Sequence, residues 1–515
     1  MAPLSEAPQH SSYAKSILLR FAHLLSAQGV DGVLSTLFFL YLAWLNKEFY
    51  GEVMLAQAAG AILVNVVQFG LYYPQVGDLS RADDREKAAI VNRVTIIKVG
   101  LLTISALTLW AVTAYQGYST SMAWIVLMIA LGNGAEAVAD SFFADLRVRG
   151  LQQIEARMKI GASGAAYGYG LVTAAMGLPP VVVALFKLVS GLIRVLFGFG
   201  WYLRAYSSRL SLLPDDWSAI YGILGKAFIF ALIQILGTVY NKLNFFFLER
   251  AAGREGVALY SSTYNLVDPV STLASEQLLA WVVFPVLAIL WWKKKEQVAP
   301  LVRNTALWLI MIALPIVFAL HTESDLLIRL IYPSEYSGAA SLQRYLVWSI
   351  PLSFESNLFQ YVMVVAGAAR MLLLFQGLTT VMNLVYNVLL VQPFGPLGGC
   401  LVLVFTKLTM TVFAFTYCQV RYRYFSARDF LFPCTLALAG LGFYVSVRPV
   451  VGLHVGVGLT LAMYLGLLWR FGMKFLGDFP RKSEEEPTKQ DTSSPGGPPE
   501  QSRGNHSEPG AVRES

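Results

Sequence analysis

The chain has 515 residues, of which 56% are hydrophobic and 14% charged, and its mean hydropathy is +0.55. Soluble domains are typically about 45–50% apolar and about 25% charged, so this composition excludes an ordinary soluble enzyme and indicates a polytopic membrane protein. The formal charge of +7 would also suit a nucleic-acid partner, and the positions of the basic residues decide between the two interpretations.

Apolar runs long enough to cross a membrane recur along the chain, and their number sets the topology. An even number puts both termini on one side, and the loops on that side carry 24 Lys and Arg residues against five on the other. Because positive charge marks the cytoplasmic side, we expect a protein of the cytoplasmic (cell inner) membrane with both termini in the cytoplasm and no nucleic-acid partner. The 14 runs lie near 15–45, 52–76, 90–114, 121–146, 158–178, 180–203, 218–247, 256–291, 303–321, 339–366, 371–392, 396–419, 429–448 and 452–472.

A weak internal repeat divides these spans into two halves. The string EFYG ends at Gly51, and REGVALY has its Gly256 205 residues later, after six further spans. Because the number of spans between the two strings is even, both halves have the same orientation in the membrane. The sequence therefore predicts an all-α fold with 14 transmembrane helices, in two six-helix lobes plus two C-terminal helices. We assign a polar N-terminal segment to 1–14, the first lobe to 15–203, a cytoplasmic inter-lobe loop to 204–217, the second lobe to 218–419, the two extra helices to 429–477 and a Pro-, Gly- and Ser-rich disordered cytoplasmic tail to 478–515.

Several basic residues lie inside the predicted spans. A Lys or Arg deep in the membrane costs about 2.5–3.5 kcal/mol, so such residues should face a hydrated interior or acidic partners. A cationic cavity between two lobes suits an anionic substrate, particularly a diphosphate. The candidates for this cavity are Arg20, Lys98, Lys187, Arg194, Lys242, Arg344 and Lys407.

Acidic and amide side chains also occur within the spans. Asn133, Glu136 and Asp140 share one face of the fourth predicted helix. Together with Asp31 they are candidates for proton or sodium coupling, and a structural salt-bridge role is an equal alternative. Asp268, Glu276 and Glu355 are further acidic partners within the spans.

Motifs of common enzyme classes are absent from the sequence. There is no Walker GxxxxGK[ST], HExxH or GxSxG string. Cys400, Cys418 and Cys434 form no CxxC pair, so neither a disulfide framework nor a zinc site is indicated. We therefore expect a transporter and not an enzyme, with no cofactor or metal beyond coupling to Na⁺ or H⁺.

Four strings in the second half of the chain resemble a known family. They are VYNKLNFFFL at 239–248, GVALYSSTY at 256–264, LIYPSEYSGAA at 330–340 and NLVYNVLLVQPFGPLGG at 383–399. In this order they resemble the polysaccharide flippases (Wzx group) of the multidrug/oligosaccharidyl-lipid/polysaccharide exporter superfamily. The first half matches mainly at Phe49–Gly51 and in the basic loop after the second span.

The resemblance implies a flippase that moves a polyprenyl-diphosphate-linked oligosaccharide by alternating access, for cell-surface polysaccharide biosynthesis. Membrane lipid and a glycan polymerase or ligase are the implied partners. It also implies a cation site on the seventh and eleventh helices, at Asn244, Asn383 and Asn387, although these amides could equally bond neighbouring helices. The alternatives are a cation-coupled drug exporter using Asp31, Glu136 and Asp140, a lipid II flippase, and a non-transporting component of glycan assembly.

Overall fold

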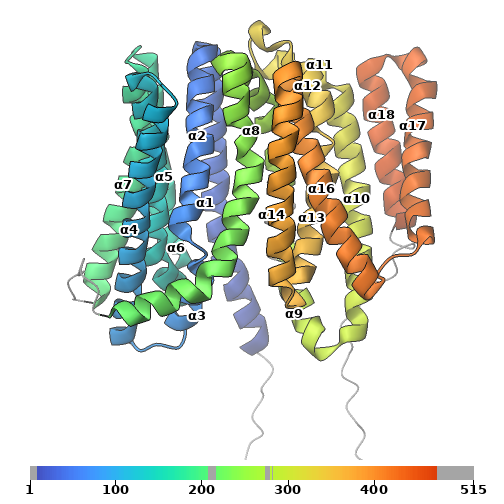
Figure 1. The fold of residues 1–515 in the computed structure, drawn as a ribbon. Helices are drawn as coiled ribbons and strands as arrows, with labels where there is room; N and C mark the ends of the chain where they lie inside the picture. Colours follow the sequence, from blue (N-terminus) through green and yellow to red (C-terminus); the bar gives the residue numbers. More distant parts are fainter. Residues whose placement is uncertain (1–8, 207–215, 273–278, 281, 473–515) are drawn as a thin grey trace, which may run out of the picture.

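The structure is a computed structural model that describes residues 9–206, 216–272, 279, 280 and 282–472, with side chains described from Ser26 onward except that of Tyr73. Throughout these ranges the chain is helical, without a β-strand (Figure 1). The predicted N-terminal segment, inter-lobe loop and C-terminal tail fall largely outside them, and their boundaries stay predictions.

The first helices pack into an N-terminal bundle. Short turns join them, and polar caps define several starts: the side chains of Asn46 and Asp83 accept the backbone N–H groups of Phe49 and Glu86, at 2.8 Å each. Within the bundle α5 packs against α2, α4 and α7, and α6 packs against α1 and α7. The helices are α1 (Gln9–Leu45), α2 (Lys47–Gln68), α3 (Tyr72–Leu79), α4 (Asp84–Tyr115), α5 (Thr120–Val148), α6 (Gln152–Ala175) and α7 (Pro180–Tyr206).

The helix α8 (Trp217–Thr272) reverses the direction of the chain at Gly253. This residue has φ 66° and ψ −171°, a conformation open to glycine because it has no Cβ. In Figure 1 the first part of α8 rises to the upper side, the side on which α1 ends and α2 begins. The second part returns from Gly253 toward the middle of the molecule, so α8 supplies two neighbouring helices to the interior.

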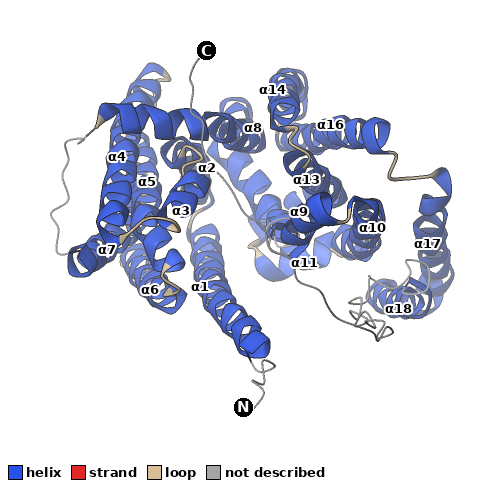
Figure 2. Ribbon diagram, turned by 90° about the horizontal axis from the view of Figure 1, so that it is seen from below, coloured by secondary structure: helices blue, strands red, loops and turns tan. Residues whose placement is uncertain are grey.

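The remaining helices form a C-terminal bundle around α8, followed by a separate pair. The pair α17 and α18 contacts α10 at the edge of this bundle and stands apart in both views (Figures 1 and 2). The helices are α9 (Phe284–Lys293), α10 (Val298–Thr322), α11 (Ser324–Ile331), α12 (Ala339–Leu346), α13 (Ser349–Val365), α14 (Ala369–Tyr386), α15 (Gln392–Phe394), α16 (Pro396–Tyr422), α17 (Leu431–Val451) and α18 (Leu453–Leu467).

Eleven helices in the described part of the chain are long and apolar enough to cross a membrane. Three of the 14 predicted spans do not coincide with one of these eleven. The span at 158–178 falls on α6, which is rich in Gly, Ala and polar residues. The span at 256–291 is divided between α8 and α9, and that at 339–366 is broken into α12 and the 17-residue α13. A multi-pass helical membrane protein is confirmed, and the count of 14 stays a prediction.

Candidate functional site

The two bundles meet at the upper side through residues of the predicted repeat. A methyl group added to Gly51 on α2 would overlap the carbonyl oxygen of Arg254, so the two backbones touch. Arg254 pairs with Glu48 at 3.1 Å and with Glu52, and Lys47 pairs with Glu255 at 3.2 Å. We call this group of five ion-pairing side chains the upper contact: Lys47, Glu48, Glu52, Arg254 and Glu255.

Aromatic groups reinforce the upper contact. Asn265 of α8 donates to the hydroxyl of Tyr50 at 2.9 Å, and the Tyr50 ring packs edge-on against that of Tyr336, with centroids 6.2 Å apart. Trp44 at the end of α1 donates its indole N–H to the carbonyl of Ile331 at 2.9 Å. The bundles are therefore joined at the upper side by charged, polar and aromatic contacts together.

Below the upper contact lies a polar cavity of about 510 Å³, which we call the central cavity. Most of its walls belong to the C-terminal bundle, and Asn65 of α2 comes from the N-terminal bundle and donates to Thr238 of α8 at 2.9 Å. Amides and tyrosines dominate the lining, which suits hydroxyl-rich ligands. The polar members are Asn65, Gln234, Thr238, Tyr240, Asn241, Lys242, Tyr264, Asp268, Ser271, Thr272, Ser353, Asn357, Gln360, Tyr361, Gln376 and Lys407.

Two lysines in the central cavity have no carboxylate within ion-pair distance in the described part of the chain. Lys407 of α16 lies over the ring of Tyr240, 5.8 Å from its centroid. Lys242 of α8 donates to the hydroxyl of Tyr264 at 2.9 Å and lies 4.3 Å from that ring's centroid. The direct partners of both ammonium groups are neutral, and Asp268 is the one carboxylate among the described lining residues, so the cavity carries a net positive charge and can bind an anion.

A second polar cavity, of about 330 Å³, continues from the central cavity toward the lower side. Asn65 and Gln234 line both cavities. The second cavity reaches Gly70 and Tyr72, beyond the end of α2, and includes Asp140 and Arg147. The two polar cavities therefore adjoin at Asn65 and Gln234, and the upper contact joins the bundles on the opposite side.

Four of the predicted charged residues form one network inside the N-terminal bundle. Glu136 of α5 accepts from Lys187 at 3.0 Å and from the hydroxyl of Ser190 at 2.6 Å, and it pairs with Arg194 at 3.4 Å. Arg194 of α7 also pairs with Asp31 of α1 at 3.3 Å. Two acids and two bases leave this cluster, which we call the Glu136 network, with no net formal charge.

Asp140 belongs to a second cluster at the base of α5. It accepts from Gln68 at 3.0 Å and pairs with Arg147 at 3.3 Å, and Arg147 binds Glu155 through two nitrogens at 2.5 and 2.9 Å. Lys98, only 1% exposed, donates to the backbone carbonyl of Ala137 at 2.8 Å. The charged groups of this cluster therefore mostly form contacts that join α2, α4, α5 and α6.

The structure therefore separates the seven predicted cavity cations. Lys242 and Lys407 line the central cavity, whereas Lys98, Lys187 and Arg194 are engaged inside the N-terminal bundle. Arg344 of α12 pairs with Asp325 of α11 and is absent from the lining of the central cavity. Arg20 lies on α1, and its side chain is outside the described residues.

The three polar residues predicted to share one face of α5 also contact different helices. Asn133 donates to Gln57 of α2 at 3.2 Å, Glu136 faces α7, and Asp140 faces α2 and α6. The sequence indicates Asp268 only as an acidic partner of the basic residues, and Gln360 and Gln376 are not among the predicted site residues. In the wall of the central cavity Gln376 donates to the side-chain oxygen of Gln360 at 2.8 Å. Their polar identity within apolar runs was the available signal.

The resemblance implied a cation site at Asn244, Asn383 and Asn387, which are all fully buried. Asn387 donates to the side-chain oxygen of Asn383 at 3.0 Å, and Asn383 donates to Thr406 at 2.8 Å. Asn244 donates to the hydroxyl of Tyr260 at 2.6 Å. Among these three asparagines, the side-chain oxygens of Asn244 and Asn387 are without a hydrogen-bond partner in the described part of the chain. Two neutral oxygens with no carboxylate are a poor ligand set for a hard cation, so these residues do not fit sodium.

We expect the thermal stability of the protein to be insensitive to sodium. At equal ionic strength the melting temperature in detergent should agree within about 1 °C between NaCl and KCl, because a cation bound only to the native state would raise it. The double variant N244D/N387D should become more stable in NaCl, since it adds carboxylates to the same geometry. A clear sodium-specific shift for the unchanged protein would contradict this assignment.

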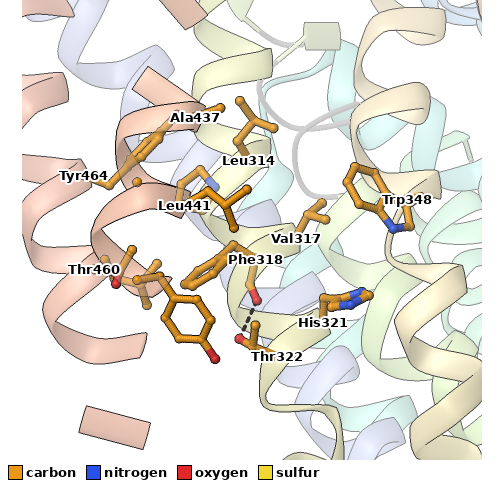
Figure 3. A pocket seen from close by; sticks show the side chains of 14 residues that line it. Leu314, Val317, Phe318, His321, Thr322, Trp348, Ala437, Leu441, Thr460 and Tyr464 are labelled. Carbon is orange, nitrogen blue, oxygen red and sulfur yellow. Dashed lines mark hydrogen bonds between the residues drawn. The ribbon is translucent and has the colours of Figure 1, made fainter. Parts of the chain in front are cut away.

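A separate apolar cavity of about 330 Å³ lies between α10 and the α17–α18 pair. Figure 3 shows Leu314, Phe318 and Leu441 among the side chains around it, with His321 and Trp348 toward one end. It shares no lining residue with the central cavity. Its walls are almost wholly hydrocarbon, so it does not contribute to binding a charged headgroup.

Helical bundles that enclose a polar cavity are the architecture of secondary membrane transporters. Residues 18–291, just over half of the chain, match the family model described as "Polysaccharide biosynthesis protein". The chain belongs to this family, which places it among the flippases of the multidrug/oligosaccharidyl-lipid/polysaccharide (MOP) exporter superfamily. A search of curated proteins finds no match.

Solved structures share the fold at low sequence identity. "Lipid II flippase MurJ, inward closed conformation" superposes with a TM-score of 0.65 at 10% identity, over 88% of this chain and 99% of that chain. An inward-facing multidrug resistance MATE family transporter superposes with a TM-score of 0.57 at 16% identity, over 76% and 94%. A MOP superfamily transporter from Pyrococcus furiosus gives 0.51 at 16% identity, over 79% and 93%. At these identities the likeness shows the fold alone.

Proposed function

We propose that the protein is a flippase that moves a polyprenyl-diphosphate-linked oligosaccharide across the cytoplasmic membrane for cell-surface polysaccharide biosynthesis. The headgroup occupies the central cavity while the prenyl chain remains in lipid. The observation that carries this proposal is the pair Lys242 and Lys407, two ammonium groups without carboxylate partners in the described part of the chain, in a cavity walled by amides and tyrosines.

The two parts of the headgroup match two kinds of wall. A diphosphate diester carries fixed negative charge and suits the lysines. Sugar hydroxyls donate and accept, as do the amides of Asn357, Gln360 and Gln376 on α13 and α14. The upper contact and the second polar cavity toward the lower side favour a resting state that loads from the side where α1 begins. With both termini in the cytoplasm and 14 spans, loading is cytoplasmic.

The drug-exporter alternative finds less support in the side chains. An exporter of cations needs accessible acidic groups, whereas Asp31, Glu136 and Asp140 are each paired with basic residues. The free charges in the central cavity are predominantly positive. These observations favour an anionic substrate, and a lipid II-like headgroup remains within the same chemical class.

The proposal is tested by reconstituting the full chain into liposomes with a radiolabelled polyprenyl-diphosphate oligosaccharide and measuring its movement between leaflets. The double variant K242Q/K407Q should slow translocation by about 10- to 100-fold or more, because charge-assisted bonds to a buried anion contribute about 1.5–3 kcal/mol each. In cells that lack the protein, the lipid-linked intermediate should accumulate on the cytoplasmic leaflet.

Lys226→Gln is the matched control, because Lys226 lies on the same helix but is exposed and does not line the central cavity. This variant should translocate at the normal rate. Normal translocation by K242Q/K407Q, with equal protein level, would contradict the proposal. No translocation by the unchanged protein would favour a non-transporting role in glycan assembly.

A further inference from the structure

We propose that Asp268 makes the central cavity a proton-linked anion site, in which the carboxylate offsets part of the charge of Lys242 and Lys407 when the cavity is empty and takes up a proton when a diphosphate binds. The inference rests on the proposed function, because it assigns a role within the same cavity.

Asp268 is joined to Lys242 through a tyrosine. The ammonium of Lys242 donates to the hydroxyl of Tyr264 at 2.9 Å, and this hydroxyl donates to Asp268 at 2.8 Å. Asp268 also interacts electrostatically with Lys407. It is the one carboxylate among the described residues that line the central cavity. The chain Lys242–Tyr264–Asp268 therefore sets a resident anion beside the two free cations without a direct ion pair.

The neighbouring elements present few other titratable groups to Asp268. Tyr260 and Tyr264 belong to α8 with Lys242, and Lys407 comes from α16. The walls from α13 and α14 supply neutral amides, whereas Glu355 on α13 does not line the cavity. The two lysines are thus the basic groups that line the central cavity together with Asp268 in the described part of the chain.

Charge arithmetic links the proton to the substrate. The empty site holds two ammonium groups and one carboxylate, a net charge of +1. A diphosphate diester brings two negative charges and bonds to the same lysines, so with Asp268 still ionised the loaded site would carry −1 inside the helical bundle. One proton on Asp268 restores neutrality. Substrate and carboxylate therefore compete for the lysines, and protonation of Asp268 resolves the competition in favour of the substrate.

By linkage, a ligand whose binding takes up one proton binds more weakly as pH rises, by up to about tenfold per pH unit. The test uses isothermal titration of the full-length protein in detergent with citronellyl diphosphate glucose, whose diester does not titrate near neutrality. Titrations in buffers of different ionisation enthalpy count the protons. The unchanged protein should take up about one proton per ligand near pH 7.

Asp268→Asn should bind the same ligand with no proton uptake and with an affinity independent of pH, and at about pH 8 it should bind about tenfold more tightly than the unchanged protein. Glu249→Gln is the matched control, because Glu249 also lies on α8 and accepts from a tyrosine, Tyr118, but does not line the central cavity. It should behave like the unchanged protein.

The outcomes separate this inference from the proposed function. Binding without proton uptake, or proton uptake that persists in D268N, overturns the role of Asp268 and leaves the anion site intact. Binding that K242Q/K407Q does not weaken, or no binding by the unchanged protein, overturns the anion site and the inference with it. Weaker binding by D268N at all pH values would show that Asp268 binds the ligand directly, which also overturns the proposal.

Discussion

Replacing Glu136 by alanine is expected to lower the free energy of unfolding by about 3–5 kcal/mol, a value typical of breaking a buried ion-pair network. The Glu136 carboxylate holds Lys187, Ser190 and Arg194 together, and the side chains of Lys187 and Arg194 are each only 12% exposed. The substitution leaves the ammonium of Lys187 and the guanidinium of Arg194 in the bundle, with Asp31 as the one acidic residue of the network that remains. Desolvated charge without a partner is the main source of the loss.

The measurement is a denaturant titration in mixed micelles, with Asp325→Asn as the control. Asp325 pairs with Arg344, but their side chains are 55% and 42% exposed, so the loss should be below about 1 kcal/mol. The pair of substitutions E136Q and K187M, made together, should recover part of the stability because it removes a charge of each sign. Equal stability of E136A and D325N would refute a structural role for the network.

This distinction changes what a loss of function at Arg194 means. From the sequence alone, neutralising Arg194 and neutralising Lys407 are both predicted to abolish surface glycan. In the structure Arg194 bonds Glu136, Asp31 and Ser163, so R194Q should lower the amount of folded protein. Lys407 has no such partners among the described residues, and K407Q should leave stability intact while it impairs binding. The protein level therefore separates the two variants.

The sequence indicated which charged residues lie within the predicted spans but could not assign their partners. Glu136 and Lys187 are 51 positions apart, and their pairing follows from the packing of α5 on α7, in which Gly132 and Gly191 allow the helices to touch. Periodicity places residues on a face of one helix, but it carries no information on which helix covers that face. The two cavity lysines were therefore indistinguishable in advance from the paired ones.

The internal repeat was informative in a different way. Its two strings predict parallel halves, and the structure brings the strings themselves together at the upper contact, where Gly51 touches Arg254. Gly51 permits this close approach, and Glu48 and Glu52 on either side of it both pair with Arg254 of the other copy. No hydropathy pattern contains that pairing, because it depends on how the halves face each other.

Cross-linking the upper contact is expected to abolish translocation. Alternating access requires the bundles to separate on one side after they close on the other. The variant K47C/E255C replaces two side chains that approach to 3.2 Å. A short bifunctional methanethiosulfonate reagent, which forms a disulfide with each cysteine, would hold the upper side closed. Translocation of the labelled lipid in liposomes should fall below about one tenth of the untreated rate and return when the link is reduced, because a single closed state cannot complete the cycle.

The control pair is R344C/D325C, on the same side of the molecule but within the C-terminal bundle, where α11 and α12 already touch. Both pairs are built with the exposed Cys434 replaced by serine, while Cys400 and Cys418 are buried. The control link should leave translocation unchanged, since those helices move together. Full activity of linked K47C/E255C would show that the upper contact stays closed throughout the cycle. Ligand binding to the linked protein should persist, because the link fixes the upper contact and leaves the two polar cavities below it in place.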